Sequence, residues 1–142
     1  MTASTLPATG SGRSRALRAP LATAAAALAA TTYVGLVDPN QSGHYPTCPF
    51  LAITGYYCPG CGSLRAVHAL THGEVGAAVG LNVLTVVGLV VVAVLWWLWA
   101  LRSWRGQPRT RVAPAWTLYL AIGTVVVFWI VRNLTMGEAL AP

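Results

Sequence analysis

Three long stretches of the chain are apolar and almost without charge, and polar segments separate them. They cover residues 17–37, 81–101 and 115–132. A helix needs about 20 apolar residues to cross a bilayer, and all three stretches are close to that length. The pattern therefore predicts an all-α integral membrane protein with three transmembrane helices.

Four polar segments flank these spans. They are residues 1–16, 38–80, 102–114 and 133–142. The first is rich in Ser, Thr and Gly and is predicted to be a disordered tail. The second holds turn formers and every cysteine of the protein, the third is a loop with four arginines, and the fourth is a short tail.

Within the second segment, the prolines and glycines before Ser63 argue against a long helix. Ser63 can cap a short interfacial helix that runs to about Thr71. Residues 74–80 are predicted to form a further helical stretch. The cysteine-rich loop would therefore be followed by short helices at the membrane surface.

The first apolar stretch has a second interpretation as a cleaved secretory signal. A basic start, an apolar middle and the small-residue triplet Ala27-Leu28-Ala29 are typical of such a signal. The apolar run continues past this triplet, so we favour a retained helix. Both interpretations send the cysteine segment to the same side of the membrane.

Composition supports the membrane assignment. Only 8% of residues are charged, against about 25% in soluble domains, and the mean hydropathy is +0.61. The net charge is +6, but the arginines flank apolar runs instead of forming a basic stripe among aromatics. We therefore expect the chain to interact with a lipid bilayer and not with nucleic acid.

Arginine placement predicts the orientation, because positively charged loops stay in the cytoplasm. Seven of the nine arginines lie before or at the very start of the first span, or between the second and third spans. The N-terminus and the arginine loop are therefore predicted to be cytoplasmic. The cysteine segment and the C-terminus are predicted to be extracytoplasmic, where disulfides can form.

The three cysteines, Cys48, Cys58 and Cys61, allow three interpretations. Cys48 can form a disulfide with Cys58 or Cys61, which would staple the loop. Alternatively, Cys58-Pro59-Gly60-Cys61-Gly62 is similar to a zinc knuckle. Three cysteines leave a zinc site one ligand short.

The fourth zinc ligand would then be a histidine: His44, His68 or His72. In the third interpretation, Cys58 and Cys61 carry out thiol–disulfide exchange. A helix start and the cation of Arg65 would favour a thiolate there.

A polar stripe follows the cysteines. If the segment after Cys61 is helical, Arg65, His68 and His72 fall on the same face as Cys61. Such a stripe would line a site, or it would face water and lipid head groups.

Three later polar residues are predicted to have interfacial or capping roles. Asn82 is expected to cap the second span, and Arg132 to reach lipid head groups from the end of the third. Asn133 follows Arg132 at this end. No Ser-His-Asp set, paired carboxylates or phosphate loop is present, so we name no catalytic residue.

At the cysteine segment the chain resembles a bacterial domain-of-unknown-function family of small membrane proteins, over roughly residues 45–135. The matching residues are Cys48-Pro49, Gly55, Cys58-Pro59-Gly60-Cys61-Gly62, Arg65-Ala66, His68-Ala69-Leu70, Gly73, Leu81-Asn82 and Arg132-Asn133-Leu134. The chain departs from the family at Val83, where proline is expected. The resemblance implies a bacterial cell membrane but no activity.

Two functions follow from these patterns. The first is a non-enzymatic membrane accessory or binding protein, with a structural disulfide or metal site, for which zinc is the candidate ion. Its partner would be another membrane protein or a second copy of the chain. The second is a membrane thiol–disulfide oxidoreductase that uses Cys58 and Cys61. The sequence does not identify a substrate or ligand.

Overall fold

The computed structural model describes residues 10–41, 43–46, 48–107 and 113–134, and all regular structure in this part is helical. The helices are α1 (Gly10–Leu36), α2 (Pro49–Thr54), α3 (Ser63–Thr71), α4 (Val75–Trp104) and α5 (Ala115–Arg132). The predicted all-α class is confirmed. The short helix α3 ends at Thr71, as the sequence predicts, and the described part of the segment between α1 and α3 contains only the six-residue α2.

Three of these helices are long and apolar enough to cross a membrane. The spans are Arg15–Leu36, Val75–Trp104 and Ala115–Arg132. Most of their large apolar side chains are exposed on the surface of the protein, as expected for side chains that face lipid. Length and composition therefore support a multi-pass membrane protein.

The helix bounds differ from the predicted segments at two places. Residues 10–16, predicted as part of a disordered tail, continue helix α1 toward the N-terminus. The predicted helical stretch 74–80 begins at Val75, and it and the second predicted span are two helical pieces of α4 that meet at a non-helical kink at Asn82 (φ −164°, ψ 93°). Parts of three predicted segments, residues 1–9, 108–112 and 135–142, lie outside the described residues.

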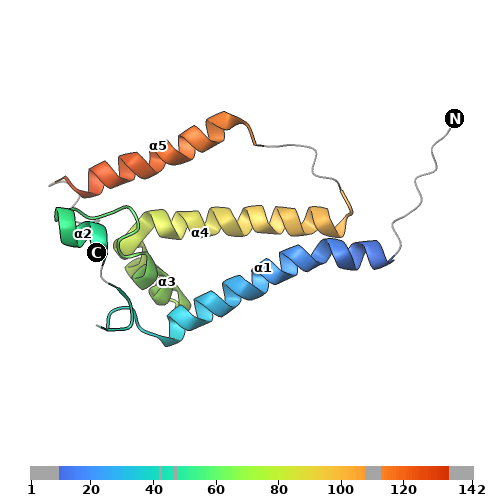
Figure 1. The fold of residues 1–142 in the computed structure, drawn as a ribbon, viewed down its shortest axis with the longest axis horizontal. Helices are drawn as coiled ribbons and strands as arrows, with labels where there is room; N and C mark the ends of the chain where they lie inside the picture. The colour runs from blue at the N-terminus through green and yellow to red at the C-terminus, as the bar shows by residue number, and fades with distance from the viewer. Residues whose placement is uncertain (1–9, 42, 47, 108–112, 135–142) are drawn as a thin grey trace.

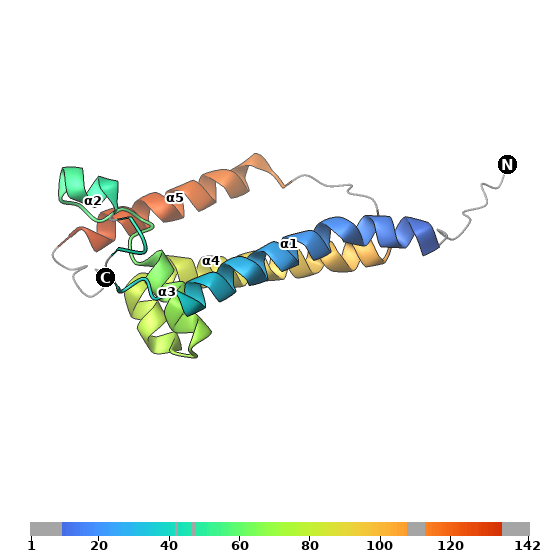
Figure 2. The same ribbon diagram turned by 60° about the horizontal axis from the view of Figure 1, so that its bottom comes forward.

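The three long helices run along the same axis of the molecule, and α2 and α3 lie at one end of them (Figure 1). This is the end where α1 and α5 finish and α4 begins, and the second view shows the same arrangement (Figure 2). Helix α3 packs against α1 and α4, and α1 also packs against α4. A small core of Ala66, Ala69 and Ala78 forms between α3 and α4.

Polar contacts hold α1 in place at both ends. His68 Nδ1 in α3 lies 2.8 Å from the Val34 carbonyl oxygen. A Cβ atom on Gly35 would come within 3.1 Å of the Thr71 hydroxyl, so a glycine permits this close approach. At the other end, the Trp96 indole N–H donates to the Pro20 carbonyl.

Helix α5 is arranged differently. It does not pack extensively against α1 or α4 within the described residues, and it diverges from α4 away from the α2 end (Figure 1). Its exposed apolar side chains continue along its length. The attachment of α5 is therefore concentrated at its C-terminal end, beside the cysteines.

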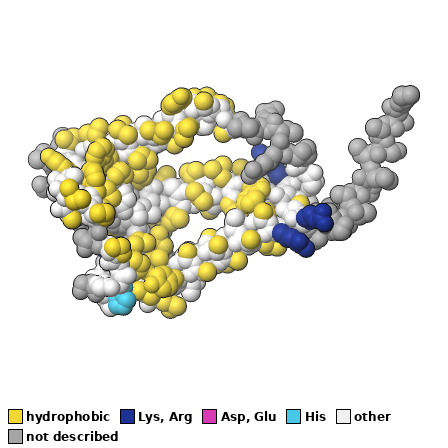
Figure 3. Space-filling view, in the orientation of Figure 1, with side chains coloured by type: hydrophobic (Ala, Val, Ile, Leu, Met, Phe, Trp, Pro, Cys, Tyr) yellow, Lys and Arg dark blue, Asp and Glu magenta, His cyan; other side chains and the backbone are white. Residues whose placement is uncertain are grey.

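Arginine side chains gather at the end of the molecule where α1 begins and α4 ends (Figure 3). This end is opposite to α2 and α3 (Figure 1). The distribution is the one that the predicted orientation requires, with the arginine-rich end in the cytoplasm. The orientation itself stays a prediction.

Candidate metal centre

A tight turn brings Cys58 and Cys61 together. The Cys61 N–H donates to the Cys58 carbonyl oxygen at 3.1 Å, and the two Sγ atoms are 3.1 Å apart. Gly62 follows with φ +81°, a left-handed conformation that glycine adopts without strain. Helix α3 begins directly after it. The turn therefore presents both sulfurs at the start of a helix.

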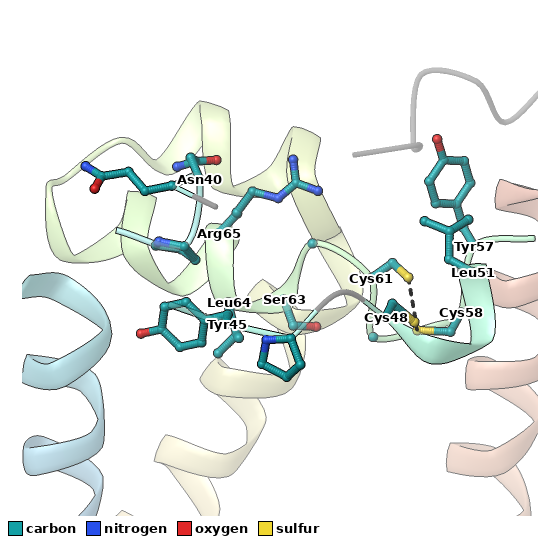
Figure 4. A pocket seen from close by; sticks show the side chains of 15 residues that line it. Asn40, Tyr45, Cys48, Leu51, Tyr57, Cys58, Cys61, Ser63, Leu64 and Arg65 are labelled. Atoms are coloured by element: carbon teal, nitrogen blue, oxygen red, sulfur yellow. Dashed lines mark hydrogen bonds between the residues drawn. The ribbon is translucent and has the colours of Figure 1, made fainter. Parts of the chain in front are cut away.

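Cys48, the residue directly before α2, places its sulfur beside those of Cys58 and Cys61. Its Sγ is 3.5 Å from the Cys58 Sγ, and all three Sγ atoms lie within 4.8 Å of one another. Figure 4 shows the three sulfurs side by side at one end of a cavity. Four ligands at about 2.3 Å around zinc place neighbouring sulfurs about 3.8 Å apart. Two of the observed separations, 3.1 and 3.5 Å, are shorter than this, so small outward shifts of the sulfurs would let all three bind one metal ion.

The expected disulfide is not present. All three cysteines are described, and all three are free. The sulfurs share one cluster instead of forming a bonded pair, which corrects the prediction of a bridge from Cys48 to Cys58 or Cys61.

The thiols of Cys48 and Cys61 differ in acidity. The pKa of Cys48 is lowered, chiefly because the backbone N–H of Leu51 in the first turn of α2 favours its thiolate. Burial raises the pKa of Cys61 to about 12, and its contact with Cys58 adds to this effect. A bound metal ion would reverse this, because coordination deprotonates a thiol outright.

Arg132 lies beneath this turn. Its Nη1 donates to the carbonyl oxygens of Cys58 at 3.2 Å and Cys61 at 3.1 Å. Its guanidinium carbon lies 5.7 Å from the Tyr57 ring centroid and 5.1 Å from that of Phe128. The residue is only 2% exposed. The prediction that Arg132 reaches lipid head groups is therefore wrong, because the turn covers the end of α5.

Asn82 supports the turn from the opposite helix. Its Nδ2 donates to the carbonyl oxygens of Pro59 at 2.9 Å and Cys61 at 3.0 Å. Its Oδ1 accepts from the Thr85 N–H at 2.9 Å, a capping contact at the kink of α4. Asn82 is 1% exposed. It thus caps the straight part of α4 and also binds the cysteine turn.

Asn133 completes the support. Its Oδ1 accepts from the Tyr57 N–H at 2.8 Å, and its Nδ2 donates to the Tyr57 carbonyl at 2.9 Å. Together, Asn82, Arg132 and Asn133 bind the backbone of residues 57–61 from two transmembrane helices. We call these three residues the clamp.

The histidines lie elsewhere. His68 faces the end of α1, with its Nε2 3.8 Å from an Asp38 carboxylate oxygen. The His72 ring is 4.4 Å from that of His68 and follows the last residue of α3. His44 is exposed. None of the three joins the cysteine cluster, so the structure does not bring the expected fourth ligand to it.

The predicted polar stripe is divided between two surroundings. Arg65 borders the same cavity as the cysteines (Figure 4). His68 and His72 face α1 and each other instead. The cause is the packing of α3, which turns the second half of the stripe toward the end of α1.

The clamp is the part of the site whose role the sequence did not predict. An ionisable side chain within an apolar span marks a functional site by default. Arg132 carries this signal, and Asn133 follows it immediately.

We predict that the metal-free thiols react at very different rates. A thiol with an ordinary pKa of about 8.5 has about a thousandfold more thiolate at pH 8 than one whose pKa is about 12. Because the thiolate is the nucleophile, but a more basic thiolate is also the stronger nucleophile, Cys48 should be alkylated about 10- to 100-fold faster than Cys61. The Cys61 rate should rise with each pH unit above 8. Timed alkylation followed by peptide mass spectrometry measures both rates, and equal rates in the folded protein would contradict this.

Comparisons with curated proteins and with solved structures found no match. A scan against family models found one match, which covers the cysteine turn, α3 and most of α4. The match lies within residues 45–135, where the sequence resembles a domain-of-unknown-function family. Residues 48–96 of this chain match the family model DUF2752, described as a protein of unknown function.

Proposed function

We propose that this chain is a bacterial membrane protein that holds one Zn²⁺ ion with Cys48, Cys58 and Cys61 at the extracytoplasmic surface. The centre would fix the cysteine segment through three protein ligands, and the protein acts as a non-enzymatic accessory or binding protein. The observation that carries this proposal is the convergence of three free sulfurs within 4.8 Å.

The positive charge of Arg132 and the hydrogen bonds of the clamp both support a metal centre at the three cysteines. Zn²⁺ with three thiolates has a net charge of −1, and the buried guanidinium of Arg132 lies directly behind the turn. Hydrogen bonds to the backbone around ligands orient metal sites. Here the clamp binds the backbone carbonyls of Cys58, Pro59 and Cys61, which fixes the turn that carries the Cys58 and Cys61 sulfurs.

The oxidoreductase alternative has less support. The Sγ atoms of Cys58 and Cys61 lie 3.1 Å apart, as thiol exchange between them would require. Cys48 joins them within 4.8 Å, however, so the cluster offers three metal ligands and not one isolated dithiol pair. No observation favours thiol exchange over metal binding.

Metal analysis of the full chain, purified in detergent without chelators, tests the proposal. We expect one zinc ion per chain and three thiols that react with an alkylating reagent only after chelation. Cys58→Ser should lose the metal, whereas the control Ala52→Ser, on the exposed side of α2, should keep it. A chain without metal but with an intramolecular disulfide would overturn the proposal, and so would three freely reactive thiols.

The proposed orientation needs a separate test. Reporter fusions after α1 and after α4 should show the cysteine segment outside and the arginine loop inside. A reporter that places the cysteine segment in the cytoplasm would contradict the extracytoplasmic centre.

A further inference from the structure

The cysteine cluster opens into a cavity of about 420 Å³. The cavity lies between α2, α3 and the loop that follows α1, and its lining includes Asn40, Tyr45, Ser63 and Arg65 besides the three cysteines. In Figure 4 the sulfurs occupy one side of it and Arg65 the other. The cluster is therefore accessible from this cavity.

Three sulfurs leave a tetrahedral metal ion with one open position. No histidine, aspartate or glutamate among the described residues joins the three cysteines. Metal sites with three protein ligands and an open fourth position bind water or a small molecule there. An ion in this cluster would take its fourth donor from the cavity.

The charge of the cavity favours an anion. Arg65 is half-buried and makes no hydrogen bond or ion pair with the part of the chain that the structure describes. The acidic residue of the neighbouring loop, Asp38, is engaged by Asn40 and faces His68. Arg132 lies behind the turn, where its cation would offset the charge of a metal ion with three thiolates. The cation of Arg65 is thus available to a ligand.

We propose that the cavity binds a small molecule with two acidic groups, one of which coordinates the metal while the other pairs with Arg65. This inference rests on the proposed metal centre and gives it a ligand class. A guanidinium binds carboxylates well because its paired N–H groups match the two oxygens. A three-thiolate ion accepts a thiolate or a carboxylate as its fourth ligand.

Cobalt-substituted full-length protein in detergent tests this, because the absorption spectrum of Co²⁺ reports its ligands. The two probes are mercaptoacetate and 2-mercaptoethanol, which share a thiol and differ in the carboxylate. We expect both to change the spectrum, with mercaptoacetate binding at least tenfold more tightly. Arg65→Gln should remove this difference and leave mercaptoethanol binding unchanged, whereas Arg65→Lys should keep part of it.

Each other result overturns the inference. Equal affinity for the two probes would contradict a role of Arg65 in binding the second acidic group. The same conclusion would follow if Arg65→Gln still bound mercaptoacetate more tightly than 2-mercaptoethanol by the same factor. Loss of cobalt from the protein, measured after desalting, would mean that the thiol competes with the cysteines instead of joining them. A protein that takes up no Co²⁺ would overturn the metal centre as well, whereas a cobalt spectrum that neither probe changes would overturn the ligand alone.

Discussion

Arg132→Met is expected to lower the affinity for Zn²⁺ by about 100-fold and the free energy of unfolding by about 1.5–3 kcal/mol. The affinity figure is the upper range for losing a group that orients metal ligands. The stability figure is that of a charged hydrogen-bond donor, about 1.5–3 kcal/mol, because the Cys58 and Cys61 carbonyls that Arg132 binds each keep a second donor, the Cys61 N–H and the Asn82 amide. Methionine retains most of the apolar stem, so the change reports chiefly on the guanidinium.

Zinc competition with a chromophoric chelator measures the affinity, and thermal unfolding in detergent measures the stability. Arg105→Met is the matched control, because Arg105 is exposed at the other end of α4. Arg132→Lys keeps the charge but lacks the planar fork of N–H donors, so it should recover stability only in part. Equal values for Arg132→Met and Arg105→Met would contradict the role of the clamp.

Asn82→Leu is expected to lower the free energy of unfolding by about 2–4 kcal/mol. The Pro59 carbonyl and the Thr85 N–H at the kink would lose their side-chain partner, at about 1–3 kcal/mol for a group left buried and unsatisfied, whereas the Cys61 carbonyl would keep Arg132 as its donor. The apolar side chain of leucine offsets part of the cost. We also expect faster hydrogen exchange in the first turns of α4 after the kink.

Thermal unfolding and hydrogen-exchange mass spectrometry test the effect of Asn82→Leu. The control Thr124→Val deletes a hydrogen bond on the exposed surface of α5, to the Leu120 carbonyl, and should change stability little. If exchange in α4 stays unchanged in Asn82→Leu, the kink does not depend on this side chain.

Much of the fold could be predicted because it follows from local chemistry. Apolar length predicts the three spans, and Ser63 with the glycines before it predicts where α3 begins. The kink at Asn82 was harder, because its cause is distant in sequence. Asn82 leaves helical geometry while its amide binds Pro59 and Cys61, some 20 residues earlier in the chain.

The three cysteines of the candidate site could be predicted from the sequence, but the clamp residues that bind the cysteine turn could not. A Cys-Pro-Gly-Cys turn places two sulfurs together by local geometry alone, whereas the approach of Cys48 depends on α2 reversing the chain. Arg132 lies 74 residues from Cys58, and nothing local distinguishes an arginine that snorkels from one that a turn covers. For His68 and His72 the sequence suggested a site that the structure does not form. Their spacing places them on the same helix face as Arg65, but the packing of α3 turns this part of the face toward the end of α1.

The way α5 is held has a mechanical consequence. This helix has 18 residues and a length of about 27 Å, and its hydrogen bonds to distant described segments come from Arg132 and Asn133. A tilt of about 10° around that end would displace Ala115 by about 5 Å. Because bilayer thickness alters helix tilt, stretching or thinning of the lipid would exert torque on the peptide carbonyls beneath the sulfurs.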